Sequence, residues 1–242
     1  FENPGVTVYQ LGVPGVPLSQ FIQMIRYGKK EFLPQHYAII VTGNDFDESL
    51  CSYRKKDGTW CFSDDYELTF VPFYGYSKVR KIAKKSAFLR YLVFHIRLDW
   101  RNIAATFKLF NTGMNVAPEF AANTERFKSK EIVDASRSVV DQFFRELEEL
   151  NLSNNITIII DADRDDIYQN VHSNSYFNEL RTYLINSARL HGVSYVDMDP
   201  IFREDFAAFG EAFNFPTDGH WNERAHRLAS QQLFKEYHRL NK

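Results

Sequence analysis

An acid–base pair near the end of the chain is the first feature of this sequence that could do chemistry. Asp218 and His220 are two residues apart, within the segment 215–222. A carboxylate can accept the Nδ1 proton of a nearby imidazole, which fixes the tautomer of the ring and leaves Nε2 to act as a general base. An Asp-x-His pattern is more often a polar loop than a catalytic pair, so it needs support from elsewhere in the chain.

Two upstream segments supply that support. Residues 9–15 include the end of the apolar run 6–11 and the Gly- and Pro-rich turn that follows it, with Gly15. Residues 40–45 include the end of the apolar run 37–41 and the Thr-Gly-Asn-Asp segment that follows it, with Asn44. Both runs are typical of β-strands, and the second is continuous, as in a strand covered on both faces.

The rest of the chain alternates between strand and helix patterns. Apolar residues at helical spacing predict helices at 18–32, 131–150 and 176–190 and after Asn222, which is a candidate N-cap. Gly192 is placed to end the third of these helices. Strands are predicted at 6–11, 37–41, 155–160 and 193–198.

This order of elements predicts an α/β fold, a three-layer α/β/α sandwich with a parallel sheet. In such a sheet, active sites gather beyond the carboxyl ends of the strands. Gly15 and Asn44 each follow a predicted strand, and Asp218 and His220 precede the last helix. We therefore expect all four residues at one end of the molecule.

Composition favours one globular domain over residues 1–242. The chain has 242 residues, is 44% hydrophobic and 25% charged, and carries a net charge of -2. This balance, without a basic run, argues against a nucleic-acid partner, and no apolar run is long enough to cross a bilayer. Residues 46–130 interrupt the alternation as an aromatic-rich insertion or cap, with a predicted helix at about 86–98. It is either a lid or binding loop, or a structural cover for one edge of the sheet.

The two cysteines, Cys51 and Cys61, flank a turn signal at Asp57-Gly58. A β-hairpin there would bring the two thiols close enough to form a disulfide. Two free thiols in a reducing compartment are the alternative. A disulfide would favour a periplasmic or secreted location.

The three segments together resemble the SGNH, or GDSL-type, hydrolase superfamily, in the right order along the chain. The resemblance implies a flavodoxin-like fold and a serine ester hydrolase that acts through an acyl-enzyme. In that mechanism His220 is the base, Asp218 orients it, and Gly15 and Asn44 donate hydrogen bonds to the oxyanion. The implied substrate is a small-molecule, glycan or lipid ester. The alternatives are an O-acyltransferase acting on a glycan and a non-catalytic, ligand-binding member of the fold.

The sequence departs from the family pattern at two points. Many members space the acid and base as Asp-x-x-His, whereas Asp218 and His220 are separated by one residue. The family's nucleophilic Ser, in a Gly-Asp-Ser turn ahead of the glycine block, has no counterpart, and Ser19 is expected to be a solvated helix residue. We therefore expect an upstream segment with the Ser, on a strand between those at 6–11 and 37–41.

Other polar residues are assigned structural roles, and no cofactor or metal site is predicted. Asp45 is expected to brace the turn after its strand, and Trp221 to be a packed aromatic. Residues 161–166 lack the Gly and Glu of a calcium loop, so they are expected to form a solvated rim. His95 is expected to be a packed or interfacial histidine.

Overall fold

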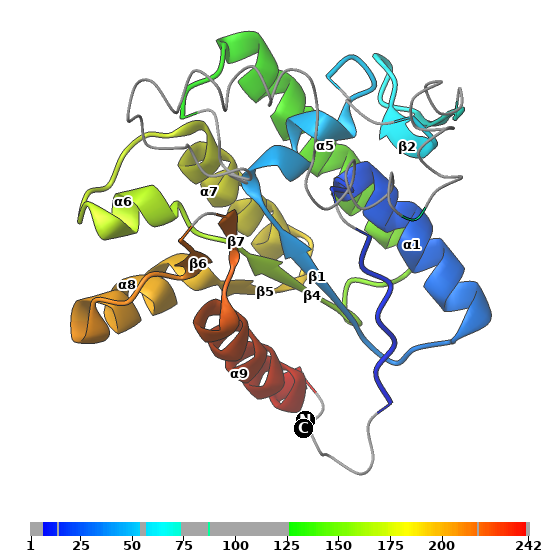
Figure 1. The fold of residues 1–242 in the computed structure, drawn as a ribbon. Helices are drawn as coiled ribbons and strands as arrows, with labels where there is room; N and C mark the ends of the chain where they lie inside the picture. Colours follow the sequence, from blue (N-terminus) through cyan, green and yellow to red (C-terminus); the bar gives the residue numbers. More distant parts are fainter. Residues whose placement is uncertain are drawn as a thin grey trace.

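A parallel sheet of three strands forms the centre of the structure, a computed structural model (Figure 1). The structure describes residues 7–13, 15–53, 57–73, 87, 126–216 and 218–240. The sheet order is β1-β4-β5, with bounds Tyr37–Val41, Ile156–Ile160 and Ser194–Asp197. Val41 pairs with Ile160, and Ile160 pairs with Asp197, so the carboxyl ends of the three strands are level. The prediction of an α/β fold with a parallel sheet is confirmed.

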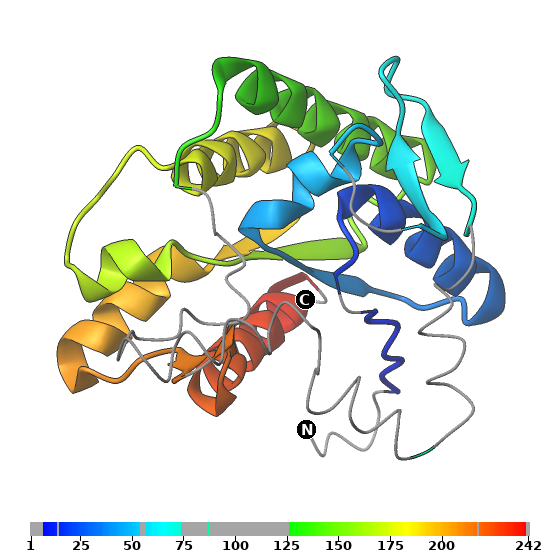
Figure 2. The same ribbon diagram turned by 45° about the horizontal axis from the view of Figure 1, so that its top comes forward.

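Helices cover both faces of this sheet (Figures 1 and 2). One face carries α1 (Leu18–Glu31), α5 (Lys130–Glu149) and α7 (Tyr176–Leu190). The other face carries α9 (Glu223–Leu240), next to α8 (Met198–Phe209). The short elements are α6 (Arg164–Tyr168), η1 (Gly43–Asp45) and η2 (Asp47–Ser49). Within the described part of the chain, no helix combines the length and apolarity needed to span a bilayer.

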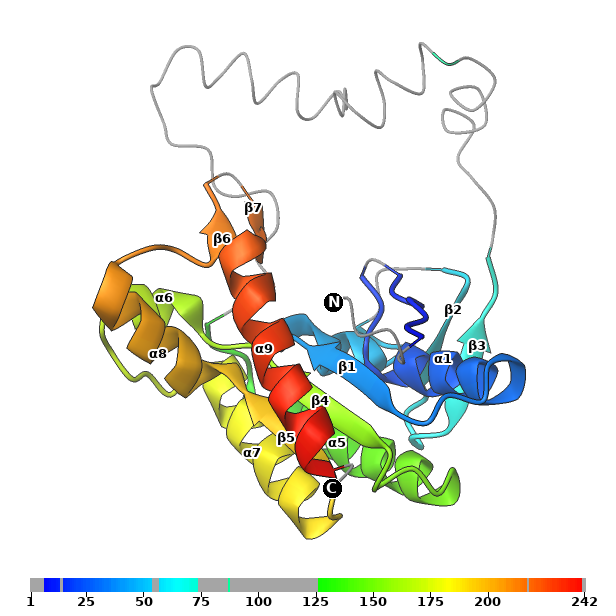
Figure 3. The same cartoon turned by 90° about the horizontal axis from the view of Figure 1, so that it is seen from below.

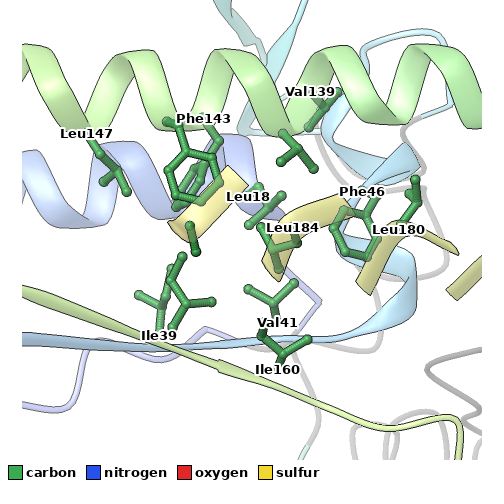
Figure 4. Packing of buried hydrophobic residues seen from close by; sticks show 14 of the residues in the cluster. Leu18, Ile39, Val41, Phe46, Val139, Phe143, Leu147, Ile160, Leu180 and Leu184 are labelled. Carbon is green, nitrogen blue, oxygen red and sulfur yellow. The ribbon is translucent and has the colours of Figure 1, made fainter. Parts of the chain in front are cut away.

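Two hydrophobic clusters fill the space between the layers. The larger cluster joins the sheet to α1, α5 and α7 through side chains such as Leu18, Val41 and Phe143 (Figure 4). The smaller one joins the opposite face to α8 and α9 through side chains such as Ile159 and Phe202. All five residues of β4 are buried: Ile156, Ile158 and Ile160 enter the larger cluster, Ile159 enters the smaller one, and Thr157 is hydrogen-bonded to His36 and Ser194.

Local capping signals set both ends of α7, and the one at Gly192 was predicted from the sequence. Ser175 caps α7, where its side chain accepts a hydrogen bond from the Asn178 N–H. Gly192 follows α7 with φ 65°, and the next N–H, of Val193, donates to the Ala188 carbonyl at 2.8 Å. This is the pattern of a Schellman C-cap.

The prediction of a strand at 6–11 is wrong for its described part, because residues 7–11 have no regular structure. The prediction that β1 is covered on both faces is also wrong, since Ile40 is 39% exposed. Among the described residues, β1 pairs only with β4, whereas β4 is flanked on both sides. A strand keeps its extended form by pairing its N–H and C=O groups, so an apolar run that finds no neighbour stays irregular.

Cys51 and Cys61 form a disulfide, but the predicted hairpin does not produce it. Instead, β2 (Thr59–Phe62) pairs with β3 (Leu68–Val71), and the turn of this hairpin follows Phe62. Gly58 precedes β2, with φ 77° and its N–H bonded to the Val71 carbonyl. Cys51 reaches its partner because the Cys51 N–H donates to the Phe62 carbonyl at 2.9 Å.

Removing this disulfide should destabilise the protein. With both cysteines changed to Ala, the free energy of unfolding is expected to fall by about 3 kcal/mol, because the cross-link closes a loop of sequence separation 10. Urea unfolding of the Cys51→Ala/Cys61→Ala variant and of the oxidised wild type measures the difference. Reduced wild type serves as the control and should unfold near the midpoint of the variant. Equal midpoints for variant and oxidised wild type would contradict the prediction.

The ends of the proposed insertion at 46–130 belong to the main body of the domain. Phe46 and Phe62 are fully buried in the larger cluster. On the far side of the segment, Lys128 forms a buried ion pair with Asp47 of η2. The predicted helix at 86–98 and His95 lie outside the described residues, apart from Ala87.

Candidate functional site

The candidate acid–base pair lies on a β-hairpin and not in the polar loop that the sequence suggests. Here β6 (Asn214–Phe215) pairs with β7 (Asp218–Trp221) in an antiparallel arrangement. Successive side chains of a strand point to opposite faces, so Asp218 and His220 share one face of β7. The Asp218 Oδ1 atom lies 2.5 Å from His220 Nδ1 and also accepts the His220 backbone N–H at 2.9 Å. These contacts orient the imidazole, and the side chain of His220 is 56% exposed.

Trp221 fastens this hairpin to the sheet from the opposite face of β7. Its side chain is buried and packs edge-on against Phe202, which confirms the prediction of a packed aromatic. The indole Nε1 donates a hydrogen bond of 2.8 Å to Asp161 Oδ1. Asp161 directly follows β4, and its N–H donates to the Val41 carbonyl at the end of β1. The hairpin is therefore held where β1 and β4 end (Figures 1 and 3).

Asn44 lies in η1, the turn that follows β1. The Asp45 carboxylate accepts hydrogen bonds from the Thr42 N–H at 2.7 Å and the Thr42 hydroxyl at 3.3 Å, so it braces this turn as predicted. The Thr42 hydroxyl also donates to Asn44 Oδ1 at 2.9 Å. This contact fixes the amide of Asn44 through its oxygen and leaves Nδ2, the donor required for an oxyanion site, on the other side of the amide.

Two buried carboxyl groups lie beside the candidate residues, Asp45 in η1 and Asp161 directly after β4. Burial raises the pKa of Asp45 to about 8, and repulsion from Glu48 and Asp161 adds to the effect. Burial also raises the pKa of Asp161, against the opposing effect of the Arg164 guanidinium. Asp45 follows Asn44 in the chain. Asp161 accepts the hydrogen bond from the indole of Trp221, the residue after His220. Because η1 follows β1, and the hairpin is bonded to Asp161 directly after β4, the second and third candidate segments lie at the same edge of the sheet.

The raised pKa of Asp45 predicts a loss of stability with rising pH. The ordinary value is 3.8 and the value in the folded protein is about 8, so between these limits the folded state holds a proton that the unfolded chain has released. This contribution to stability is complete below about pH 4 and declines as the pH rises to about 8, by at most about 1.4 kcal/mol per pH unit. The Asp45→Asn variant, which cannot titrate there, should lose less stability between about pH 5 and pH 8 in urea unfolding. Parallel pH profiles for the two proteins would contradict the prediction.

The prediction that residues 161–166 form a solvated rim is wrong. Asp161, Asp163, Arg164 and Asp166 are all buried, because each has polar partners inside the protein. The Asp163 carboxylate, for example, caps α6 and accepts the Ser175 hydroxyl at 2.7 Å. The sequence reasoning missed the contact of Asp161 with the hairpin, although the position of this residue after a strand was the available signal.

The structure places Gly15 in the exposed turn before α1, with φ 64°, a backbone conformation that favours glycine. The prediction that Ser19 is solvated is wrong, because this residue is fully buried. Its hydroxyl donates to the Trp60 carbonyl at 3.0 Å, and its N–H donates to Ser49 Oγ at 3.1 Å. Ser19 therefore ties α1 to β2 and η2, and its hydroxyl has a structural role.

The candidate site thus contains an oriented imidazole, a carboxylate and a side-chain amide. Among the described residues, no group of three or more His, Cys, Asp and Glu side chains is arranged to hold a metal ion. Comparison of the chain with protein-family models, with curated proteins and with solved structures gave no match.

Proposed function

We propose that this protein is a serine ester hydrolase that acts through an acyl-enzyme. The observation that carries the proposal is the Asp218–His220 hydrogen bond, on a hairpin held at the carboxyl edge of a parallel sheet. A neutral imidazole that donates Nδ1–H to a carboxylate has the tautomer that a general base needs. In α/β folds, this edge of the sheet is also where active sites form.

In the proposed mechanism, His220 Nε2 removes the proton of a serine hydroxyl as its oxygen attacks the ester carbonyl. The Gly15 N–H and Asn44 Nδ2 donate to the resulting oxyanion, and each such donor typically contributes about 10²–10³ in rate. The tetrahedral intermediate collapses as His220 returns the proton to the departing alcohol, leaving an acyl-serine. Water, activated by the same imidazole, then releases the acid and restores the serine.

We propose that the serine comes from a segment outside the described residues, on a strand that pairs with β1. The support is that, within the described chain, β1 pairs only with β4 and that Ile40 of β1 is 39% exposed. A strand in that place, parallel to β1, would have its carboxyl end beside η1, where the candidate residues lie. Because the side chain of His220 is itself 56% exposed, water can reach it, which favours hydrolysis over transfer to a second substrate.

The test is labelling of the full-length protein with a fluorophosphonate, which reacts with activated serines. Labelling is expected in the wild type and should be lost in His220→Ala. The matched control is His226→Ala, which removes an exposed imidazole of α9 close to Trp221 and should still be labelled. Mass spectrometry of the labelled peptide identifies the serine. If no labelling depends on His220, the protein is not a serine hydrolase, and a ligand-binding role replaces this proposal.

A further inference from the structure

A groove with a volume of about 600 Å³, lined mostly by polar and charged residues, lies beside α7. Its walls include Arg137 of α5, Asn178 and Glu179 of α7, and Asp199 and Arg203 of α8. None of its lining residues belongs to η1, β6 or β7, so this groove is a separate surface from the candidate catalytic site. The volume is within the range of small-molecule sites, about 300–1,000 Å³.

Three buried polar atoms at this groove have no hydrogen-bond partner among the described residues. They are Arg137 Nε, Asn178 Oδ1 and Asp199 Oδ2. Five side-chain atoms of the described residues are in this condition, and three of the five belong to residues that line this one groove. Buried polar atoms are nearly always satisfied in folded proteins, so such a concentration points to a partner that binds there.

The remaining contacts fix the hydrogen-bonding role of each atom. The Asn178 Nδ2 group donates to Asp166 Oδ2 at 2.9 Å and to the Ser173 carbonyl at 3.0 Å, so Oδ1 is left as an acceptor. Asp199 uses Oδ1 to accept from Arg203 Nε at 3.0 Å, and its Oδ2 is left as a second acceptor.

The donor in the groove comes from Arg137. Its Nη2 group donates to Glu179 Oε1 at 2.5 Å, and the Nε–H is left over. The three unpartnered atoms are therefore two acceptors and one donor. A hydroxyl group both donates and accepts, so a ligand with several hydroxyls can match all three.

The charges in the groove argue against an anionic ligand. Each of the three guanidiniums on its walls is already paired: Arg137 with Glu179, Arg181 with Asp197 and Arg203 with Asp199. The two unused oxygens, of Asn178 and Asp199, would repel a phosphate or a carboxylate. We propose that this groove binds a neutral saccharide.

Binding requires a small rearrangement at the mouth of the groove. The three unpartnered atoms are closed off from water in this arrangement, although their residues line the groove. The side chain of Arg137 is 40% exposed, and exposed side chains change rotamer within nanoseconds. A change of the Arg137 rotamer would expose its Nε–H to a ligand in the groove. This inference does not depend on the proposed esterase activity, since binding is measured without catalysis.

The test uses the full-length protein and a printed array of neutral oligosaccharides, followed by calorimetric titration with the best soluble oligosaccharide. The Arg137→Lys variant keeps a cation near Glu179 but removes the Nε donor. It is expected to bind at least about tenfold more weakly, the effect of losing one charged hydrogen bond. The matched control is Arg145→Lys, an exposed change on the same helix, α5, which should bind like the wild type.

Three results would overturn the proposal. The first is the absence of binding to any neutral oligosaccharide on the array. The second is equal affinity of the Arg137→Lys variant and the wild type, which would place the saccharide elsewhere on the protein. The third is competition by inorganic phosphate at the same site, which would make the groove an anion site. The catalytic proposal stands or falls separately, on the labelling experiment.

Discussion

The Asp218→Asn variant of the full-length protein is expected to hydrolyse an activated ester about 10³- to 10⁴-fold more slowly than the wild type. Asp218 accepts the hydrogen bond from His220 Nδ1, whereas an asparagine amide can donate to that nitrogen and favour the wrong tautomer. Nε2 would then carry the proton and could not act as a base. Since the substrate-binding surface is unchanged, the loss should appear in kcat and leave KM nearly constant.

A matched control separates this effect from a general loss of carboxylate charge. Asp165→Asn makes the same change at an exposed position of α6 and should retain wild-type kcat. If the Asp218→Asn variant keeps most of its activity, Asp218 does not orient the base, and the proposed mechanism loses its central contact.

The Lys128→Met variant is expected to lower the free energy of unfolding by about 3–5 kcal/mol. The side chains of Lys128 and Asp47 are only 10% and 12% exposed, so removal of the lysine leaves a buried carboxylate without its cation. The hydroxyl of Tyr176, 3.4 Å from Asp47 Oδ1, is a weak substitute. Urea unfolding followed by circular dichroism measures the change.

Two further variants test the physical reason for this loss. Lys130 is two residues after Lys128 and forms an exposed ion pair with Asp134. Breaking this pair in the Lys130→Met variant should change the free energy of unfolding by less than about 1 kcal/mol. The double variant Lys128→Met/Asp47→Leu removes both charges and should recover much of the lost stability, because the cost comes from the unpaired carboxylate. A double variant no more stable than Lys128→Met would contradict this explanation.

The sequence predicted the elements whose signals are local. The bounds of α7, Tyr176–Leu190, agree with the prediction at both ends, because Ser175 caps its start and Gly192 adopts the positive φ that ends it. The strands β1, β4 and β5 were found within a residue or two, because buried strands of a parallel sheet are short apolar runs. In these segments, local preference and tertiary packing favour the same conformation.

Segments that depend on a partner were predicted less well. The run 6–11 has the composition of a strand, yet its described part, residues 7–11, is irregular, since strand pairing is a long-range property. The helices α6 and α8 were missed, and the segment 215–222 was taken for a loop although it includes part of a hairpin. The pairing of Cys51 with Cys61 was one of two open alternatives, because spacing alone does not fix a disulfide.

The sequence by itself determined the α/β class, the main helices and the residue types of the candidate site. Only the tertiary structure decided which polar side chains are buried. Ser19 and Asp161 are as polar as any solvated residue, and their burial follows from partners 41 and 60 residues away, the Trp60 carbonyl and the Trp221 indole. A hydrogen bond between distant segments has no signature in local sequence, because it depends on how the whole chain packs. For that reason, the contact that holds the His220 hairpin at the sheet edge became visible only in three dimensions.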